Sequence, residues 1–90
     1  MLKTLENLIL TIRQKKTSLD EKSYTSKLLR DKNLSVEKVK EEIAELIEAV
    51  ENNSNTVHEA ADVLYHLLVY LEGNGVRIED IMLELDKRRK

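Results

Sequence analysis

The chain has 90 residues, no cysteine, no proline and a formal net charge of −2. This length fits one domain, and the balanced charge excludes the basic surface that holds a nucleic-acid backbone. Without cysteine, the chain has neither disulfides nor thiolate metal sites. The absence of proline, Phe and Trp argues against a turn-rich β fold. The composition therefore predicts a single all-α domain over residues 1–90, with a small core that is completed by a second chain.

No stretch of the sequence approaches the ~20 apolar residues that a membrane span needs. The apolar run at 8–10 is too short for the core of a secretion signal, and Arg13, Lys15 and Lys16 follow it. We therefore expect no membrane partner and a cytoplasmic location.

Apolar residues recur at three- and four-residue spacing along most of the chain, which is typical of amphipathic helices. The first predicted helix runs from near the start to Lys16 and is followed by a polar loop at 17–21. A short helical turn is expected around residues 24–29. Ser35 is then the expected N-cap of a third helix that runs to about Glu51.

A cluster of asparagine and serine at 52–55 predicts a turn. The fourth helix is expected from about Thr56 to Glu72. It should stop at Gly73–Gly75, where glycine or asparagine adopts the left-handed conformation that ends many helices. A last helix begins at about Ile78.

The third predicted helix carries several glutamates: Glu41, Glu42, Glu45 and Glu48. At 100° per residue, Glu42 and Glu45 lie roughly 60° apart and next to the apolar stripe. Glu41 and Glu48 fall farther round the helix, toward water. Taken alone, this acidic face is equally consistent with an ordinary solvated surface.

The fourth predicted helix is apolar on both sides, as is usual for a helix that is buried on both sides. Its carboxylates Glu59 and Asp62 are three residues apart and project from the same side. Burying them requires cations or protons. Two such carboxylate pairs on neighbouring antiparallel helices would form an all-oxygen site suited to Mg²⁺ or Mn²⁺ rather than Zn²⁺.

Simpler roles are open for some of these residues. Thr56-x-x-Glu59 fits a capping box at the start of the fourth helix. A hydrogen-bonded, partly buried imidazole accounts for His58 and for His66 without any metal. His66 lies one turn after Asp62, however, and we expect it to donate to Asp62 and support that ligand from behind.

These residues resemble a known family. Glu41-Glu42-x-x-Glu45 followed by Glu59-x-x-Asp62 is similar to the acidic motif of the MazG-like, all-α nucleotide pyrophosphohydrolases. The segments SYTxKLL at 23–29 and EAADVLYHLLV at 59–69 resemble the phosphoribosyl-ATP pyrophosphohydrolase family of histidine biosynthesis, and the similarity covers nearly the whole chain. That family usually has glycine where this chain has Lys40, a difference that bears on substrate contacts nearby.

The resemblance implies a MazG-like helical bundle whose four-helix core is completed by dimerisation, as a homodimer or a dimer of dimers. It implies Mg²⁺-dependent cleavage of the α–β phosphoanhydride of phosphoribosyl-ATP, which gives phosphoribosyl-AMP and pyrophosphate. The implied metal ligands are Glu42, Glu45, Glu59 and Asp62, and the catalytic residues are these four with Glu41. The implied candidates for substrate contact are Tyr24, Thr25, Lys27, Lys38 and Arg88.

Two other functions remain open. A related pyrophosphatase that acts on free (d)NTPs would have the same acids, although the SYTxKLL and YHLLV segments argue against it. A non-enzymatic helical interaction module would use the apolar fourth helix only to build an oligomer. That second alternative leaves Asp62 without a purpose.

Overall fold

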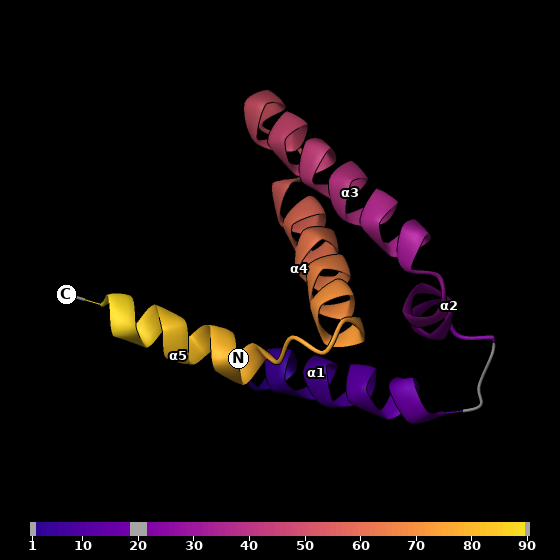
Figure 1. The fold of residues 1–90 in the computed structure, drawn as a ribbon. Coiled ribbons are helices and arrows are strands. Elements are labelled where there is room, and N and C mark those ends of the chain that lie inside the picture. The colour runs from indigo at the N-terminus through magenta and orange to yellow at the C-terminus, as the bar shows by residue number, and fades with distance from the viewer. Residues whose placement is uncertain (1, 19–21, 90) are drawn as a thin grey trace.

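The computed structural model describes residues 2–18 and 22–89, and within these ranges the regular structure is entirely helical (Figure 1). The helices are α1 Leu2–Thr17, α2 Tyr24–Arg30, α3 Lys32–Asn52, α4 Thr56–Gly73 and α5 Ile78–Arg88. The predicted all-α class and the order of the helices are confirmed. Most of the loop predicted at 17–21 lies outside the described residues, and Thr17 is the last residue of α1.

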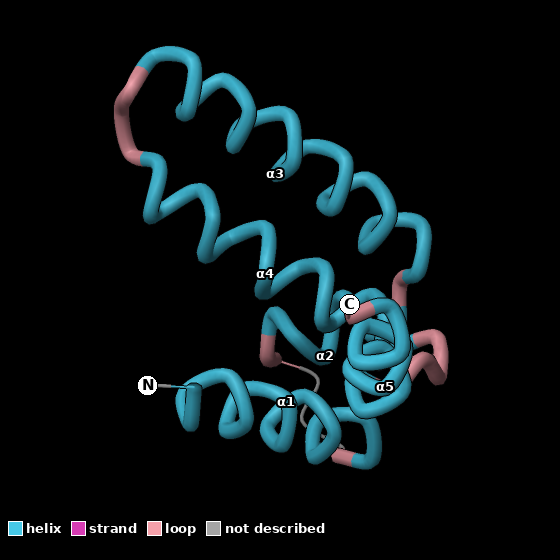
Figure 2. Tube along the Cα trace, turned by 90° about the vertical axis from the view of Figure 1, so that its left-hand side faces the viewer, coloured by secondary structure: helices cyan, strands magenta, loops and turns pink. Residues whose placement is uncertain are grey.

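Helices α3 and α4 lie side by side and run in opposite directions, and together they form the arm that carries the acidic residues (Figure 2). The predicted turn between them is confirmed. Asn53 and Asn55 both have φ 52°, in the left-handed region. Asparagine tolerates this region better than other non-glycine residues do, which explains why the reversal can be so tight.

The predicted start of the third helix is wrong by four residues. Asp31 is the N-cap of α3, with an extended backbone and a carboxylate that accepts the N–H of Leu34 at 3.0 Å. Ser35 is instead buried within the first turn of the helix. Aspartate is as good an N-cap as serine, so two candidates stood close together in the sequence and the earlier one is used.

The predicted capping box at the start of α4 is also wrong. The N-cap is Asn55, and its side chain makes no capping hydrogen bond. The hydroxyl of Thr56 donates to the carbonyl of Ala49 on α3, at 3.4 Å, instead of capping its own helix. Glu59 therefore has no capping role and is available for another one.

The hydrophobic core lies between α1, α2 and α4, and its buried members are Ile9, Ile12, Leu28, Leu68 and Val69. The last residue of α4, Gly73, lets this helix approach α2 closely. A Cβ at Gly73 would lie only 3.1 Å from Cδ2 of Leu29. The core thus holds the short α2 against α4, which is one of the two helices that carry the acids.

An ion pair that the sequence did not reveal connects α1 to α4 and α5. Arg13 donates from Nε and Nη2 to the two carboxylate oxygens of Glu72, both at 2.9 Å, and the Glu72 side chain is only 3% exposed. Arg13 Nη1 also donates to Glu79 on α5 at 3.0 Å. These hydrogen bonds lower the pKa of Glu72 and lower the pKa of Glu79 to about 2.

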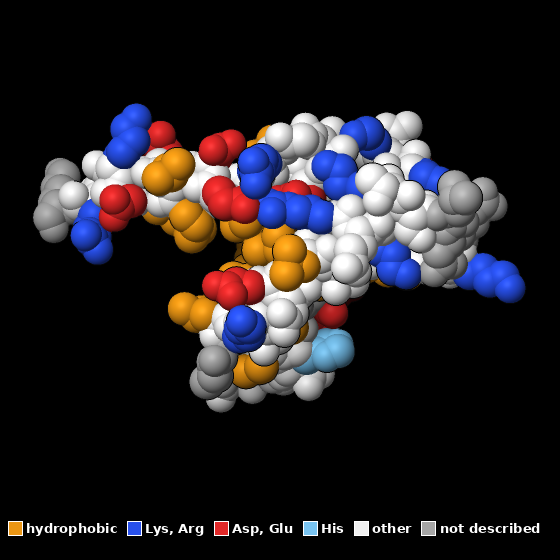
Figure 3. Space-filling view, turned by 90° about the horizontal axis from the view of Figure 1, so that it is seen from below, with side chains coloured by type: hydrophobic (Ala, Val, Ile, Leu, Met, Phe, Trp, Pro, Cys, Tyr) orange, Lys and Arg blue, Asp and Glu red, His pale blue; other side chains and the backbone are white. Residues whose placement is uncertain are grey.

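Large apolar side chains remain exposed on the single chain in two areas. One is a stripe along the α3–α4 arm, made of Ile43, Ile47, Val50, Val57 and Leu64. The other is a groove of about 970 Å³ between α1 and α5, lined by apolar residues such as Leu5, Ile9, Ile78 and Met82. Figure 3 shows hydrophobic side chains gathered along the projecting α5 and in the angle beside it. One chain therefore leaves apolar side chains of the α3–α4 arm and of the α1–α5 groove uncovered.

No described helix combines the length and the apolar character needed to cross a membrane.

Replacing Arg13 should destabilise the fold strongly. Arg13→Met leaves the Glu72 carboxylate buried without a counter-charge, which should lower the free energy of unfolding by about 3–5 kcal/mol. Urea unfolding at pH 7 and a fixed protein concentration measures this loss. The matched control is Glu79→Gln, whose half-exposed ion pair should contribute less than about 1 kcal/mol. Equal, small losses in both variants would contradict the role assigned to Arg13.

The contribution of Arg13 should also depend on pH. Because Arg13 lowers the pKa of both carboxyls, its stabilisation is fully present above their unfolded value of about 4.3. It is lost as pH falls through the folded values, about 2 for Glu79. The difference in unfolding free energy between wild type and Arg13→Met should therefore shrink from about pH 4 to about pH 2. A difference that stays constant over that range would count against this linkage.

Candidate active site

Carboxylates from α3 and α4 meet where the two helices face each other. One carboxylate oxygen from each of Glu42, Glu45 and Glu59 lies within 4.8 Å of the others. A second group at the same spacing contains His58, Glu59 and Asp62, in which His58 Nε2 lies 3.5 Å from Asp62 Oδ2. The structure thus brings the four predicted metal ligands into two overlapping groups that share Glu59.

Two oxygens in this cluster are buried and lack a partner. Within the described ranges, neither Glu42 Oε2 nor Glu59 Oε2 has a hydrogen-bond partner. Burial raises the pKa of both carboxyls, and the neighbouring Glu45 raises both further. A divalent cation would supply the missing positive charge, and a set of oxygen ligands suits a hard cation such as Mg²⁺. The residues present therefore fit a metal ion.

A hollow of about 230 Å³ opens beside Glu45 and Glu59. It has room for an ion with several waters, since one water occupies about 30 Å³. Glu48 also lines this hollow, although the helical spacing predicted that it faces water. Glu48 is exposed as expected. Residues of the turn between α3 and α4 line the same hollow, however, so Glu48 lies beside the acidic cluster and not on the far face of α3.

Glu41 lies outside both carboxylate groups. It is 51% exposed and forms an ion pair with Lys38 at 3.5 Å. The positive charge of Lys38 also acts on Tyr24 and Glu42, so its ammonium lies at the edge of the acidic cluster. The structure therefore places one cation and one exposed carboxylate next to the candidate metal ligands.

The predicted contact between His66 and Asp62 is present, but it is made to the backbone. His66 Nδ1 lies 2.8 Å from the carbonyl oxygen of Asp62, not from its carboxylate. The other ring nitrogen lies 2.9 Å from the hydroxyl of Tyr24. Next to Tyr24, the hydroxyl of Thr25 is hydrogen-bonded to the hydroxyl of Tyr65. Two of the predicted substrate contacts are thus tied to α4 beside Asp62.

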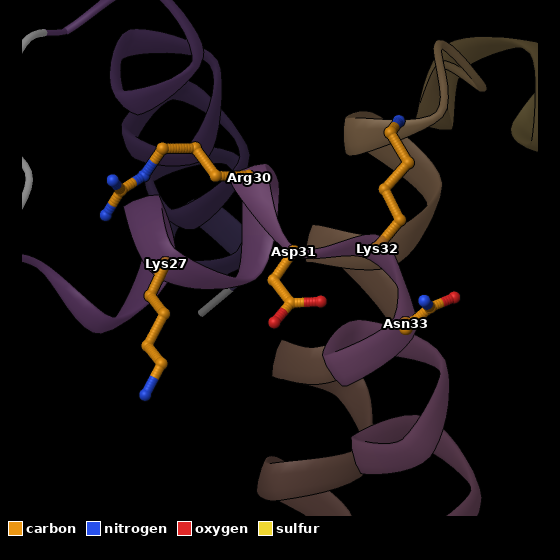
Figure 4. A pocket seen from close by; sticks show the side chains of 5 residues that line it. All are labelled: Lys27, Arg30, Asp31, Lys32 and Asn33. Carbon is orange, nitrogen blue, oxygen red and sulfur yellow. The ribbon is translucent and has the colours of Figure 1, made fainter.

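Lys27 lies farther away, at the junction of α2 and α3. It lines a depression of about 640 Å³ with Arg30, Asp31, Lys32 and Asn33 (Figure 4). The ammonium of Lys32 is used to close the end of α4, where it donates to the carbonyl of Gly73 at 2.6 Å. Asp31, the single residue between α2 and α3, lies eleven residues before Glu42, or roughly 16 Å along the helix axis.

Arg88 is not brought to this site within one chain. It lies in the last turn of α5 and forms an ion pair with Glu84 at 3.0 Å. Figure 1 shows α5 pointing away from the α3–α4 arm.

Comparison with known proteins places these residues in a family. The model of phosphoribosyl-ATP pyrophosphohydrolase matches residues 5–89. Phosphoribosyl-ATP pyrophosphatase of Haloarcula marismortui is 39% identical over 90 residues, which cover 94% of this chain and 92% of that protein. The protein of the same name from Methylobacterium nodulans is 42% identical over 88 residues, which cover 94% of this chain and 82% of the relative.

A longer relative also matches. The histidine biosynthesis bifunctional protein HisIE of Thermotoga maritima is 42% identical over 82 residues, which cover 88% of this chain but 42% of that protein. The chain therefore corresponds to one part of the bifunctional protein and to nearly the full length of the Haloarcula relative. The resemblance inferred from the acidic motif and its flanking segments is confirmed, and the chain belongs to the phosphoribosyl-ATP pyrophosphohydrolase family.

Proposed function

We propose that this chain, acting as one domain in the cytoplasm, hydrolyses phosphoribosyl-ATP to phosphoribosyl-AMP and pyrophosphate with the help of Mg²⁺. This reaction is the second step of histidine biosynthesis. The observation that carries the proposal is the pair of buried, unpartnered carboxylate oxygens on Glu42 and Glu59. In a family of pyrophosphohydrolases, such a pair is best explained as part of a site for a metal ion that contacts phosphate.

In this proposal, the ion is held by Glu42, Glu45, Glu59 and Asp62. When bound, Mg²⁺ neutralises charge on the phosphate oxygens and lowers the pKa of a bound water molecule. Glu41 is exposed beside the ligands, so its carboxylate can orient the attacking water and accept its proton. A bond then forms between the water oxygen and one of the two phosphorus atoms of the α–β anhydride while its bond to the bridging oxygen breaks. The charge of the two products, phosphoribosyl-AMP and pyrophosphate, is partly balanced by Lys38.

The remaining substrate contacts extend from the acids toward α2. Tyr24 is 44% exposed, so its ring is accessible to a nucleotide. Thr25 lies on the same turn, and Lys27 offers its ammonium at the α2–α3 junction to a phosphate that is distant from the metal. Since α5 points away from the acids of its own chain, Arg88 would have to reach the site of a second chain.

We also propose that two chains pair through the α3–α4 arm, with higher association such as a dimer of dimers left open. Val57 is 85% exposed and Ile47 is 55% exposed on this arm. Leaving such a stripe in water is unfavourable, and a mate with the same stripe would bury it in a four-helix core.

The function is tested by pyrophosphate release from phosphoribosyl-ATP, ATP and dUTP, each with and without Mg²⁺. We expect turnover of phosphoribosyl-ATP that disappears when the metal is chelated, and much slower turnover of the other two. Faster turnover of ATP or dUTP would favour a pyrophosphatase of free nucleotides. No turnover of any of the three would favour the interaction module.

Neutralising a ligand should abolish metal-dependent turnover without unfolding the protein. Asp62→Asn, Glu45→Gln and Glu59→Gln should each lower kcat/KM by at least roughly a hundredfold, because an amide offers one neutral oxygen in place of a carboxylate. Melting without metal should be unchanged or slightly improved, since each change removes like-charge repulsion. The exposed Glu51, on the opposite face of α3, provides the control Glu51→Gln. A Glu59→Gln enzyme with normal activity and a normal Mg²⁺ response would exclude Glu59 as a ligand.

Placing a charge on the exposed stripe should separate the chains. Ile47→Glu buries an unpaired carboxylate at the proposed interface, so light scattering should show a monomer where wild type is a dimer. Lys3→Glu, at an exposed position of α1 outside both apolar areas, should leave the wild-type mass unchanged. A wild-type chain that is a stable monomer at micromolar concentration would refute the proposed pairing.

A further inference from the structure

A chain of hydrogen bonds runs from α2, through a side chain of α4, to the backbone of a candidate metal ligand. His66 lies one turn after Asp62 on α4, and it is buried, with 7% of its surface exposed. Its Nδ1 contacts the Asp62 carbonyl and its Nε2 contacts the Tyr24 hydroxyl, at 2.8 and 2.9 Å. The two ring nitrogens of one histidine thus join two helices directly behind the acidic cluster.

The carbonyl partner fixes the direction of the bond to Asp62, and in the neutral imidazole this also fixes the direction of the bond to Tyr24. A carbonyl oxygen can only accept, so Nδ1 carries the hydrogen and donates to Asp62. In the neutral imidazole Nε2 is then an acceptor, and the hydroxyl of Tyr24 donates to it. Burial raises the pKa of Tyr24, which keeps this hydroxyl protonated at neutral pH.

Neighbouring aromatic rings restrict the movement of the Tyr24 and His66 side chains. Tyr24 is stacked on Tyr65, with 6.2 Å between ring centroids and 18° between ring planes. Tyr65 meets the His66 ring edge-on at 5.0 Å. Helix α2 has only seven residues, too few to be stable on its own, so it depends on contacts of this kind for its place against α4.

Asp62 itself has little else to orient it. Its carboxylate is 38% exposed and lies 3.5 Å from Nε2 of His58, a largely exposed side chain on the same helix. Groups that hold a metal ligand from behind reduce the number of orientations it can adopt, and removing them commonly weakens metal binding or activity by about 10- to 100-fold.

We propose that Tyr24 and His66 are positioning residues, which act through the backbone of Asp62 to hold its carboxylate toward the ion. The hydroxyl of Tyr24 contacts His66 and not the substrate, whereas the resemblance implied that Tyr24 is a substrate contact. This inference rests on the proposed metal-dependent function, and it extends that function by assigning the SYTxKLL segment a role in building the site.

Two conservative variants break the same bond from its two ends. Tyr24→Phe removes only the hydroxyl, whereas His66→Asn keeps an N–H donor near the position of Nδ1 but gives Tyr24 no acceptor. Each should lower kcat and raise the Mg²⁺ concentration for half-maximal thermal stabilisation by about tenfold. The KM for phosphoribosyl-ATP should stay near its wild-type value. The double variant should be no worse than the poorer single variant, because both remove one interaction.

Tyr70→Phe is the matched control, since it removes a hydroxyl from the next turn of the same helix. Kinetics and the Mg²⁺ response should be unchanged in that variant. A rise in KM alone in Tyr24→Phe would make the Tyr24 hydroxyl a substrate contact and overturn the proposal. Additive losses in the double variant, or no loss in either single variant, would also overturn it. If His66→Asn fails to fold, Tyr24→Phe decides the matter alone.

The thermal shift with Mg²⁺ alone separates this proposal from the function on which it rests. A wild-type protein that is stabilised by Mg²⁺ but does not hydrolyse phosphoribosyl-ATP would refute the proposed function. The same measurement on Tyr24→Phe would still show whether the hydroxyl positions Asp62, because it needs no substrate.

Discussion

A buried carboxylate needs a counter-charge, and this requirement organises both ends of α4. At the C-terminal end, Glu72 is compensated within the chain by Arg13, which binds it through two parallel hydrogen bonds. At the N-terminal end, Glu59 faces Glu42 and Glu45 of α3, and these like charges make the burial of its carboxylate still less favourable. One end of the helix is therefore joined to α1 by an ion pair, and the other carries the proposed cation site.

The two ends of α4 are linked through α2. The core holds this short helix against α4 near Gly73, while the Tyr24 hydroxyl contacts His66, one turn after Asp62. Because α3 follows α2 after a single residue, the position of α2 also sets where α3 begins. The two rows of acids consequently face each other in a register that is determined by packing on the far side of α4.

Much of this arrangement could be predicted from local patterns. Helical spacing placed Glu42, Glu45, Glu59 and Asp62 correctly on two adjacent helices, because each pair lies within one turn. The N-cap of α3 was misplaced because Asp31 and Ser35 are both good caps. The ion pair of Arg13 with Glu72 could not be predicted, since its members are 59 residues apart and only the tertiary fold brings them together. The hydrogen bond from the Thr56 hydroxyl to Ala49 depends on the geometry of the turn between α3 and α4, which the capping pattern does not contain.

The separation of 59 residues between Arg13 and Glu72 has a consequence for the order of folding. The α3–α4 hairpin closes over three residues, whereas the bond between Arg13 and Glu72 closes a loop that contains most of the chain. Loop-closure entropy and contact order both favour the hairpin as the earlier structure. The acids would then be gathered while the rest of the chain is still open, so their mutual repulsion would be a barrier on the folding pathway as well as a property of the finished site.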